Sequence, residues 1–268
     1  MNTAESLLRR ERAVVAVSLA VLMLLAWIYI WRGAGMGMSA LDMTMFALFP
    51  HAHAEPMPGM AMPPIDFAIV ATMWWVMMIA MMLPSAAPFL LLHGRVLRHA
   101  NAQGQLSARY ASTIFLATGY LAVWLLFSIA AAALQYLLQQ AGLISAMMLW
   151  SKSALLSATV LIGAGVYQLS PLKRTCLRHC RGPVEFLTRH WRPGRVGAFT
   201  MGFEHGLWCV GCCWMLMALL FVGGVMNLAW IALLALLVFA ETVLSKGATV
   251  SRITGVTLVA WGLITLWI

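Results

Sequence analysis

The segment from Glu204 to Cys213 concentrates side chains that bind metals. Residues three and four apart share one face of a helix, so His205, Cys209 and Cys213 form one stripe with Cys212 beside it. Sulfur ligands of this kind favour Cu(I). Close helix packing would explain the glycines in this segment, but not a glutamate and a histidine within an apolar run, where ionisable groups are costly unless paired or liganded. We therefore predict a metal site here, with Glu204 as its proton acceptor.

A second apolar segment offers thioether ligands. Met73, Met77 and Met81 recur every four residues and would share one helix face. Such a stripe alone is typical of packing, because methionine fills irregular gaps. If the two helices touch, residue counting from their ends puts Cys213 near Met73 or Met77 and His205 near Met81. Copper is then the expected metal, with zinc and haem as open alternatives.

Two connecting segments carry further candidate ligands. Cys176, His179 and Cys180 lie in a basic inner loop, residues 170–196, as a possible second metal site or as reduced thiols without a role. The outer loop, residues 32–65, is rich in methionine and histidine, a composition that suits copper but also a loop lying on the bilayer surface. Its soft side chains are Met36, Met38, Met43, Met45, His51, His53, Met57, Met60 and Met62.

Composition determines which elements must position these residues. Hydrophobic residues make up 63% of the chain and charged residues 9%, against roughly 45–50% and 25% in soluble proteins. Apolar runs of about 20 residues are long enough to cross a bilayer. The sequence thus predicts an all-α, polytopic transmembrane helix bundle of about seven spans, forming a single domain. The spans are expected at residues 13–31, 66–92, 110–138, 150–169, 197–222, 228–244 and 249–267.

The basic residues indicate the orientation of this bundle. The 17 Lys and Arg include only two, Arg32 and Lys152, in segments on the outer side of the seven-span arrangement, which leaves 15 on the inner side. Positive residues are retained on the cytoplasmic side, so the N-terminus is expected in the cytoplasm. The net charge of +9 is explained by these loops, and no nucleic-acid partner is expected. The last two spans are joined by tight turns, and a re-entrant hairpin is an alternative for them.

Three stretches resemble a bacterial family of predicted metal-binding integral membrane proteins. They are the methionine-rich Met73–Ser85, the stretch Tyr167–Lys173 that leads to Cys176 and Cys180, and Gly202–Met217. The resemblance covers roughly Phe67 to Glu241 and implies a protein of the bacterial inner membrane that binds metal. The family often has Glu-Lys where this chain has Glu241-Thr242, so the sequence does not establish an ion pair there.

The residues support one leading function and two alternatives. The leading hypothesis is copper handling, by transport or by delivery to a periplasmic or membrane copper protein, with metal held between helices. The first alternative is a membrane thiol-disulfide oxidoreductase, using Cys209 with Cys212 and Cys176 with Cys180. The second is an assembly subunit without metal. The chain has no nucleotide-binding loop and no evident hydrolase set, so an enzyme is less expected, and its oligomeric state is not defined.

Overall fold

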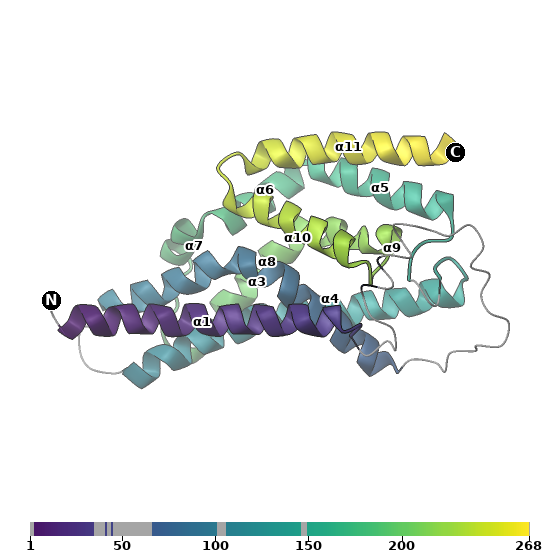
Figure 1. Cartoon of the computed structure of the whole chain (residues 1–268). Coiled ribbons are helices and arrows are strands. Elements are labelled where there is room, and N and C mark those ends of the chain that lie inside the picture. The colour runs from purple at the N-terminus through teal and green to yellow at the C-terminus, as the bar shows by residue number, and fades with distance from the viewer. Residues whose placement is uncertain are drawn as a thin grey trace.

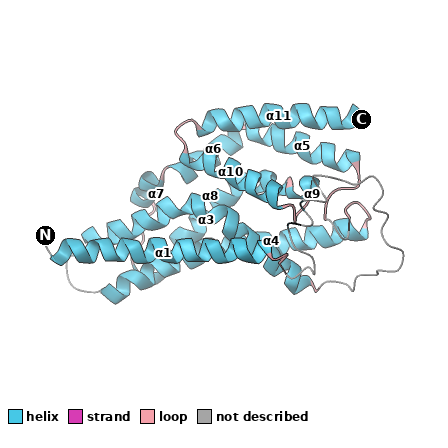
Figure 2. Cartoon of the chain, in the orientation of Figure 1, coloured by secondary structure: helices cyan, strands magenta, loops and turns pink. Residues whose placement is uncertain are grey.

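Every regular element of the described chain is a helix, which confirms the predicted all-α class (Figure 2). The computed structural model describes residues 3–34, 41, 44, 66–100, 106–145 and 149–267. The long helices are α1 (Thr3–Trp31), α3 (Phe67–Ala100), α4 (Leu106–Gln140), α8 (Gly194–Ala218) and α11 (Gly247–Trp267). The shorter ones are α5 (Ala154–Leu169), α6 (Pro171–Arg181), α7 (Pro183–Arg189), α9 (Leu220–Gly223) and α10 (Leu228–Val243). Of the predicted outer loop, only residues 32–34, 41 and 44 lie within these ranges, so its methionines and histidines lie outside the described residues.

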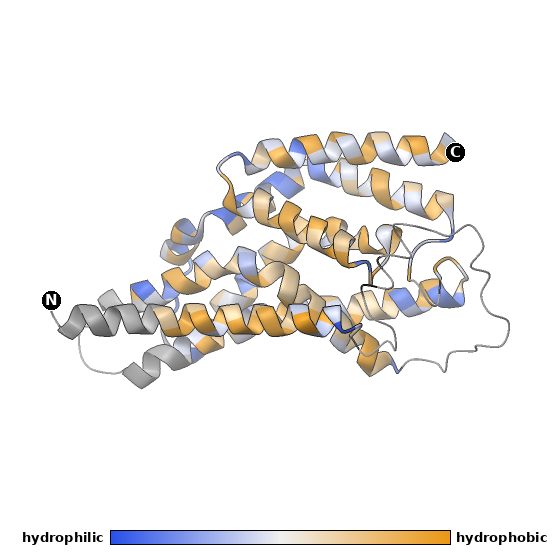
Figure 3. Cartoon of the chain, viewed as in Figure 1, coloured by the Kyte–Doolittle hydropathy of each residue, from blue (hydrophilic) through white to orange (hydrophobic). Residues whose placement is uncertain are grey.

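By length and composition, the described helices include five candidate membrane spans, or six if one bent pair counts as a span, beside the predicted count of about seven. Five candidate spans lie within 13–31, 67–96, 112–140, 194–223 and 247–267, and α5 with α6 makes a sixth if the bent pair is one span. All seven predicted apolar runs contain helix, but α10 has only 16 residues. At ~1.5 Å per residue it reaches about 24 Å, less than the ~30 Å hydrocarbon core. Apolar residues dominate the long helices (Figure 3).

Helix α8 packs against several other helices and carries the predicted ligands between Glu204 and Cys213 (Figure 1). It packs along α4 and against α6, while α3 packs on α4 and α1 packs on α3. The contact between α4 and α8 is very close, because a Cβ atom on Gly202 would overlap the backbone carbonyl of Leu116. Small residues therefore do allow close packing on α8, as the packing interpretation of its glycines required. Helices α5 and α11 pair with each other at the opposite edge from α1 in this view.

The basic segment 170–196, predicted as a loop, contains the two short helices α6 and α7. Pro171 disfavours a helical backbone at the preceding residue, and Ser170 is indeed extended, with ψ of 154°. The same serine caps α6, because its side-chain oxygen accepts a hydrogen bond from the backbone N–H of Lys173 at 3.1 Å. The chain bends by 65° between α5 and α6. This bend directs Cys176 and Cys180 toward α8 instead of leaving them in an irregular loop.

Candidate metal centre

Three cysteine thiols from two helices meet next to the middle of α8. The sulfur atoms of Cys180, Cys209 and Cys212 all lie within 4.8 Å of one another. One pair joins the two helices, with Cys180 Sγ 3.7 Å from Cys212 Sγ. Cys209 and Cys212 are 3% and 1% exposed, and Cys180 is half-buried. All three are free thiols, so this thiol triad presents soft donor atoms in a largely water-free position.

A buried ion pair attaches α6, which contributes Cys180 to the triad. Lys173 Nζ lies 2.6 Å from Glu241 Oε2, and both side chains are 1% exposed. Gln168 of α5 donates a second hydrogen bond, at 2.6 Å, to the other carboxylate oxygen of Glu241. Because a buried charge is stable only when paired and hydrogen-bonded, this network links α5, α6 and α10. Lys173 and Cys180 are seven residues apart, two helical turns along α6, so the same helix carries the anchor and the ligand.

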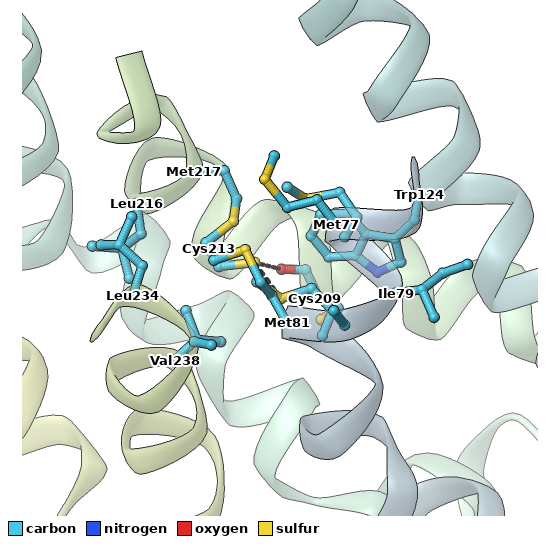
Figure 4. Close-up of a cluster of buried hydrophobic side chains, with 14 of the residues drawn as sticks. Met77, Ile79, Met81, Trp124, Cys209, Cys213, Leu216, Met217, Leu234 and Val238 are labelled. Atoms are coloured by element: carbon cyan, nitrogen blue, oxygen red, sulfur yellow. Dashed lines mark hydrogen bonds between the residues drawn. The ribbon is translucent and has the colours of Figure 1, made fainter. Parts of the chain in front are cut away.

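Cys213 contacts α3 and does not join the triad. Its sulfur lies 3.8 Å from Met82 Sδ, and its thiol donates a hydrogen bond to the Cys209 carbonyl oxygen at 2.9 Å. The hydroxyl of Tyr120 on α4 lies 3.3 Å from Cys209 Sγ and 3.3 Å from the carbonyl oxygen of Met82. Figure 4 shows Cys209 and Cys213 in one sulfur-rich region with Met77, Met81 and Met217. A second sulfur pair thus lies beside the triad, about one helical turn along α8.

The two predicted ladders meet, but in a different register from the one counted from sequence. Met73, Met77 and Met81 are all buried on α3. Cys213 contacts Met82, five residues beyond Met77, and the ring of His205 stacks on Phe89 at 3.9 Å, eight residues beyond Met81. Hydropathy locates helices along the chain but does not fix how far one is shifted along its neighbour, so the depth comparison was wrong by one to two turns.

Several predicted ligands have other partners in this structure. Glu204 pairs with Arg192 at 2.7 Å. The ring of His179 stacks on Trp208 at 4.1 Å, while Cys176 lies against Gly211, where a Cβ atom would be 3.1 Å from its sulfur. His205 is 2% exposed, and its Nδ1 has no hydrogen-bond partner among the described residues. The predicted groups Cys176–His179–Cys180 and His205–Cys209–Cys212–Cys213 are therefore regrouped, with Cys180 joining Cys209 and Cys212.

Sequence reasoning missed three features of this centre. Met82 directly follows Met81 in the same methionine-rich stretch, so only the spacing rule excluded it. Tyr120 belongs to an apolar run with no other candidate ligand, and no local pattern could have selected it. The Lys173–Glu241 pair joins residues 68 positions apart. Lys173 does close the motif Tyr167–Lys173 on which the family resemblance rests, which was the available clue.

The donor set of the triad fits a soft monovalent ion. Thiolates select Cu(I), zinc or iron–sulfur clusters, and structural zinc sites have four ligands in tetrahedral geometry. The group found among the described residues has three. The Tyr120 hydroxyl donates its proton to the Met82 carbonyl oxygen, and turning that proton to a Cys209 thiolate would give a charge-assisted hydrogen bond that stabilises the ionised form. The arrangement can therefore hold Cu(I) through two or three sulfurs.

The fold and this centre define a class, a multi-pass helical membrane protein with a buried thiol cluster suited to copper. No curated protein and no solved structure matches the chain. The family model PpoB2, described as a copper chaperone, matches residues 71–265. The chain therefore belongs to the PpoB2 copper chaperone family. The matched range includes both helices of the triad and the Lys173–Glu241 pair. Membership of a chaperone family implies a client protein that receives copper.

Proposed function

We propose that the thiol triad of Cys180, Cys209 and Cys212 carries Cu(I) as cargo and that the chain passes this ion to a client copper protein. The observation that supports this most directly is the meeting of three free thiols from α6 and α8 within 4.8 Å. Apolar packing alone would not need cysteines on both faces of this contact. A chaperone site must also release its metal, and three ligands allow a client sulfur or imidazole to enter as one leaves.

The neighbouring sulfur atoms suggest a route for the ion. Cys213 and Met82 lie beside the triad at 3.8 Å from each other, and the methionines of α3 continue from there along the helix. Thioethers bind Cu(I) without needing to lose a proton. We propose that the ion moves from the triad past this pair toward the methionines Met73, Met77 and Met81, and from there to the outer Met/His-rich loop.

The proposed setting is the bacterial inner membrane with the N-terminus in the cytoplasm. The distribution of Lys and Arg supports this orientation. It puts the basic helices α6 and α7 on the cytoplasmic side and the 32–65 loop on the periplasmic side. The client would then be a periplasmic or membrane copper protein. Glu204 is kept as the candidate proton acceptor for copper that arrives without a thiolate carrier, since each cysteine that binds metal loses a proton.

The metal content of detergent-purified protein tests this proposal. The unaltered chain, supplied with copper and zinc, is expected to retain about one copper per chain. A variant with Cys180→Ser, Cys209→Ser and Cys212→Ser is expected to retain almost none, while Cys176→Ser, which removes a neighbouring thiol outside the triad, keeps it. Equal copper in the triple variant and the unaltered protein would rule out the triad. Four-coordinate zinc in the unaltered chain would argue against copper cargo.

The thiol oxidoreductase alternative now involves a different pair of cysteines. Cys212 Sγ lies 3.7 Å from Cys180 Sγ on the neighbouring helix, a pairing that the predicted CxxC motif did not include. A disulfide between them would need the sulfurs to close to about 2.05 Å. A purified protein that contains this disulfide, has no copper and exchanges it with small thiols would favour the alternative.

A further inference from the structure

A polar cavity opens between α6 and α7. Its volume is about 560 Å³, within the range of small-molecule sites. It is lined by two arginines, two histidines, one glutamate and one aromatic ring: Arg178, Arg189, His179, His190, Glu185 and Phe186, together with Gly182. None of the copper-handling steps proposed above uses these residues. Their types suit an anion and a metal at the same place.

Each histidine ring bonds back to the carbonyl four residues earlier, His179 within α6 and His190 at the residue that caps α7. Nδ1 of His179 lies 3.0 Å from the Thr175 carbonyl oxygen, and Nδ1 of His190 lies 3.2 Å from the Phe186 carbonyl oxygen. A carbonyl can only accept a hydrogen bond, so Nδ1 carries the proton in both rings. In a neutral ring Nε2 then carries the lone pair that can bind a metal. A hydrogen bond of Nδ1 to a carbonyl is the arrangement that orients histidines ligating metal through Nε2.

The charge of the cavity indicates the form in which copper would arrive. Arg189 pairs with Glu185 at 2.9 Å on the exposed surface, while Arg178 forms no ion pair with an acidic residue in the described part of the chain. With neutral imidazoles, the two arginines and one glutamate leave a net positive charge. Such a site repels a free copper ion and attracts an anion. A Cu(I) complex with a small anionic thiol meets both requirements, and such thiols are kept reduced in the cytoplasm.

The cavity is adjacent to the triad along the chain. His179 immediately precedes Cys180, the most exposed of the triad thiols. At the inner wall Phe186 stacks on His190 at 4.6 Å and meets the buried His205 edge-on at 5.3 Å. Phe186 therefore lies between the cavity and the core at this wall, and Cys180, next to His179 in the chain, is the triad thiol that we assign to accept the metal.

We propose that this cavity is the port at which a Cu(I)–thiolate complex docks and transfers its metal to the triad. Arg178 and Arg189 attract the anionic carrier, and Nε2 of His179 or His190 holds copper while ligands exchange. Copper stays Cu(I) throughout. Each copper–carrier sulfur bond that breaks is replaced by a bond to a cysteine sulfur, and the proton lost by that cysteine goes to the departing carrier thiolate. The port rests on the proposed function, because it supplies the triad.

Loading rates test the port separately from the triad. Metal-free full-length protein in detergent is mixed anaerobically with Cu(I)–glutathione or with Cu(I)–acetonitrile, and the thiolate–Cu(I) absorbance is followed. The double variant His179→Phe with His190→Phe keeps ring stacking but lacks the nitrogens. It is expected to load about tenfold more slowly from both sources and to reach the same final copper content. Arg178→Gln with Arg189→Gln is expected to load about tenfold more slowly from Cu(I)–glutathione alone, an effect that added salt weakens.

The outcomes separate the two proposals. Arg174→Gln, an exposed change on α6 outside the cavity lining, is the control and should load at the unaltered rate. Unaltered loading rates in both double variants, with normal copper binding by the triad, would overturn the port and leave the proposed function intact. If Arg174→Gln loads as slowly as the double variants, the slower loading is not specific to the cavity, and this result would overturn the port too. Failure of the unaltered chain to bind copper would overturn both.

Discussion

Cys180 on α6 and Cys212 on α8 place their sulfur atoms 3.7 Å apart although 32 residues separate them in the chain. The contact exists because the chain turns by 65° at Ser170–Pro171 and α6 packs on α8. A site divided between two helices can be assembled or opened by small movements of one helix. That property is useful in a protein that must bind copper and then release it.

The two cysteines of α6 should differ sharply in their effect on copper affinity. Cys180→Ser removes a triad sulfur and is expected to weaken Cu(I) binding at least about tenfold, a loss at the low end for disturbed metal sites. Cys176→Ser is expected to change it by less than about twofold, because Cys176 lies against Gly211 outside the triad. Competition with a coloured Cu(I) chelator measures both. Equal losses in the two variants would contradict the assignment.

Oxidation should link α6 to α8 covalently. A protease site is inserted between Arg189 and Gly194, in the connection between α7 and α8. Treatment with diamide, which accepts the two electrons and two protons of the thiols, should then keep the two fragments together on a non-reducing gel. Prior loading with Cu(I) should prevent this link by occupying the sulfurs. Cys180→Ser should abolish the link and Cys176→Ser should not; the opposite pattern would contradict the geometry.

The Lys173–Glu241 pair should determine whether α6 stays in place. Glu241→Gln leaves a buried lysine without its counter-charge, and removing one partner of a buried pair costs roughly 3–5 kcal/mol. We expect a lower unfolding midpoint in detergent and a loss of copper, since α6 carries Cys180. Lys173→Met combined with Glu241→Leu removes both charges and should restore most of the stability. A double variant as unstable as the single one would show that the charge pairing is not the cause.

Replacing His205 should leave copper binding intact. Its ring stacks on Phe89, its Nδ1 lacks a partner in the described structure, and it is not among the triad ligands. His205→Phe keeps the stacking and removes a buried unpaired polar atom, a change worth up to about 1–3 kcal/mol, less the cost of a larger ring. We expect unchanged copper content and equal or higher stability. Loss of copper would return the imidazole to the ligand set that the sequence predicted.

The sequence by itself determined the class of fold and the chemistry of the site. Apolar runs too long for a soluble core required helices in a bilayer, since every backbone polar group must be bonded within its own segment there. The cysteines of α8 were recognisable because a period of 3.6 residues puts ligands three and four apart on one face. Both inferences depend only on neighbours along the chain, which is why they agreed with the structure.

The tertiary structure decided which of these residues meet. Hydropathy does not depend on how far a helix is shifted along its neighbour, so the sequence left the offset of α3 against α8 undetermined. Met82 and Phe89 lie at the contacts that were expected of Met77 and Met81. Likewise, the segment 170–196 was predicted as a loop because its many charged residues obscure the pattern of buried positions on α6. The packing of that helix on α8, with Lys173 buried against Glu241, moved Cys180 out of its local cysteine pair and into the thiol triad. Contacts of this kind depend on shape and charge between distant segments, and no local pattern of residues specifies them.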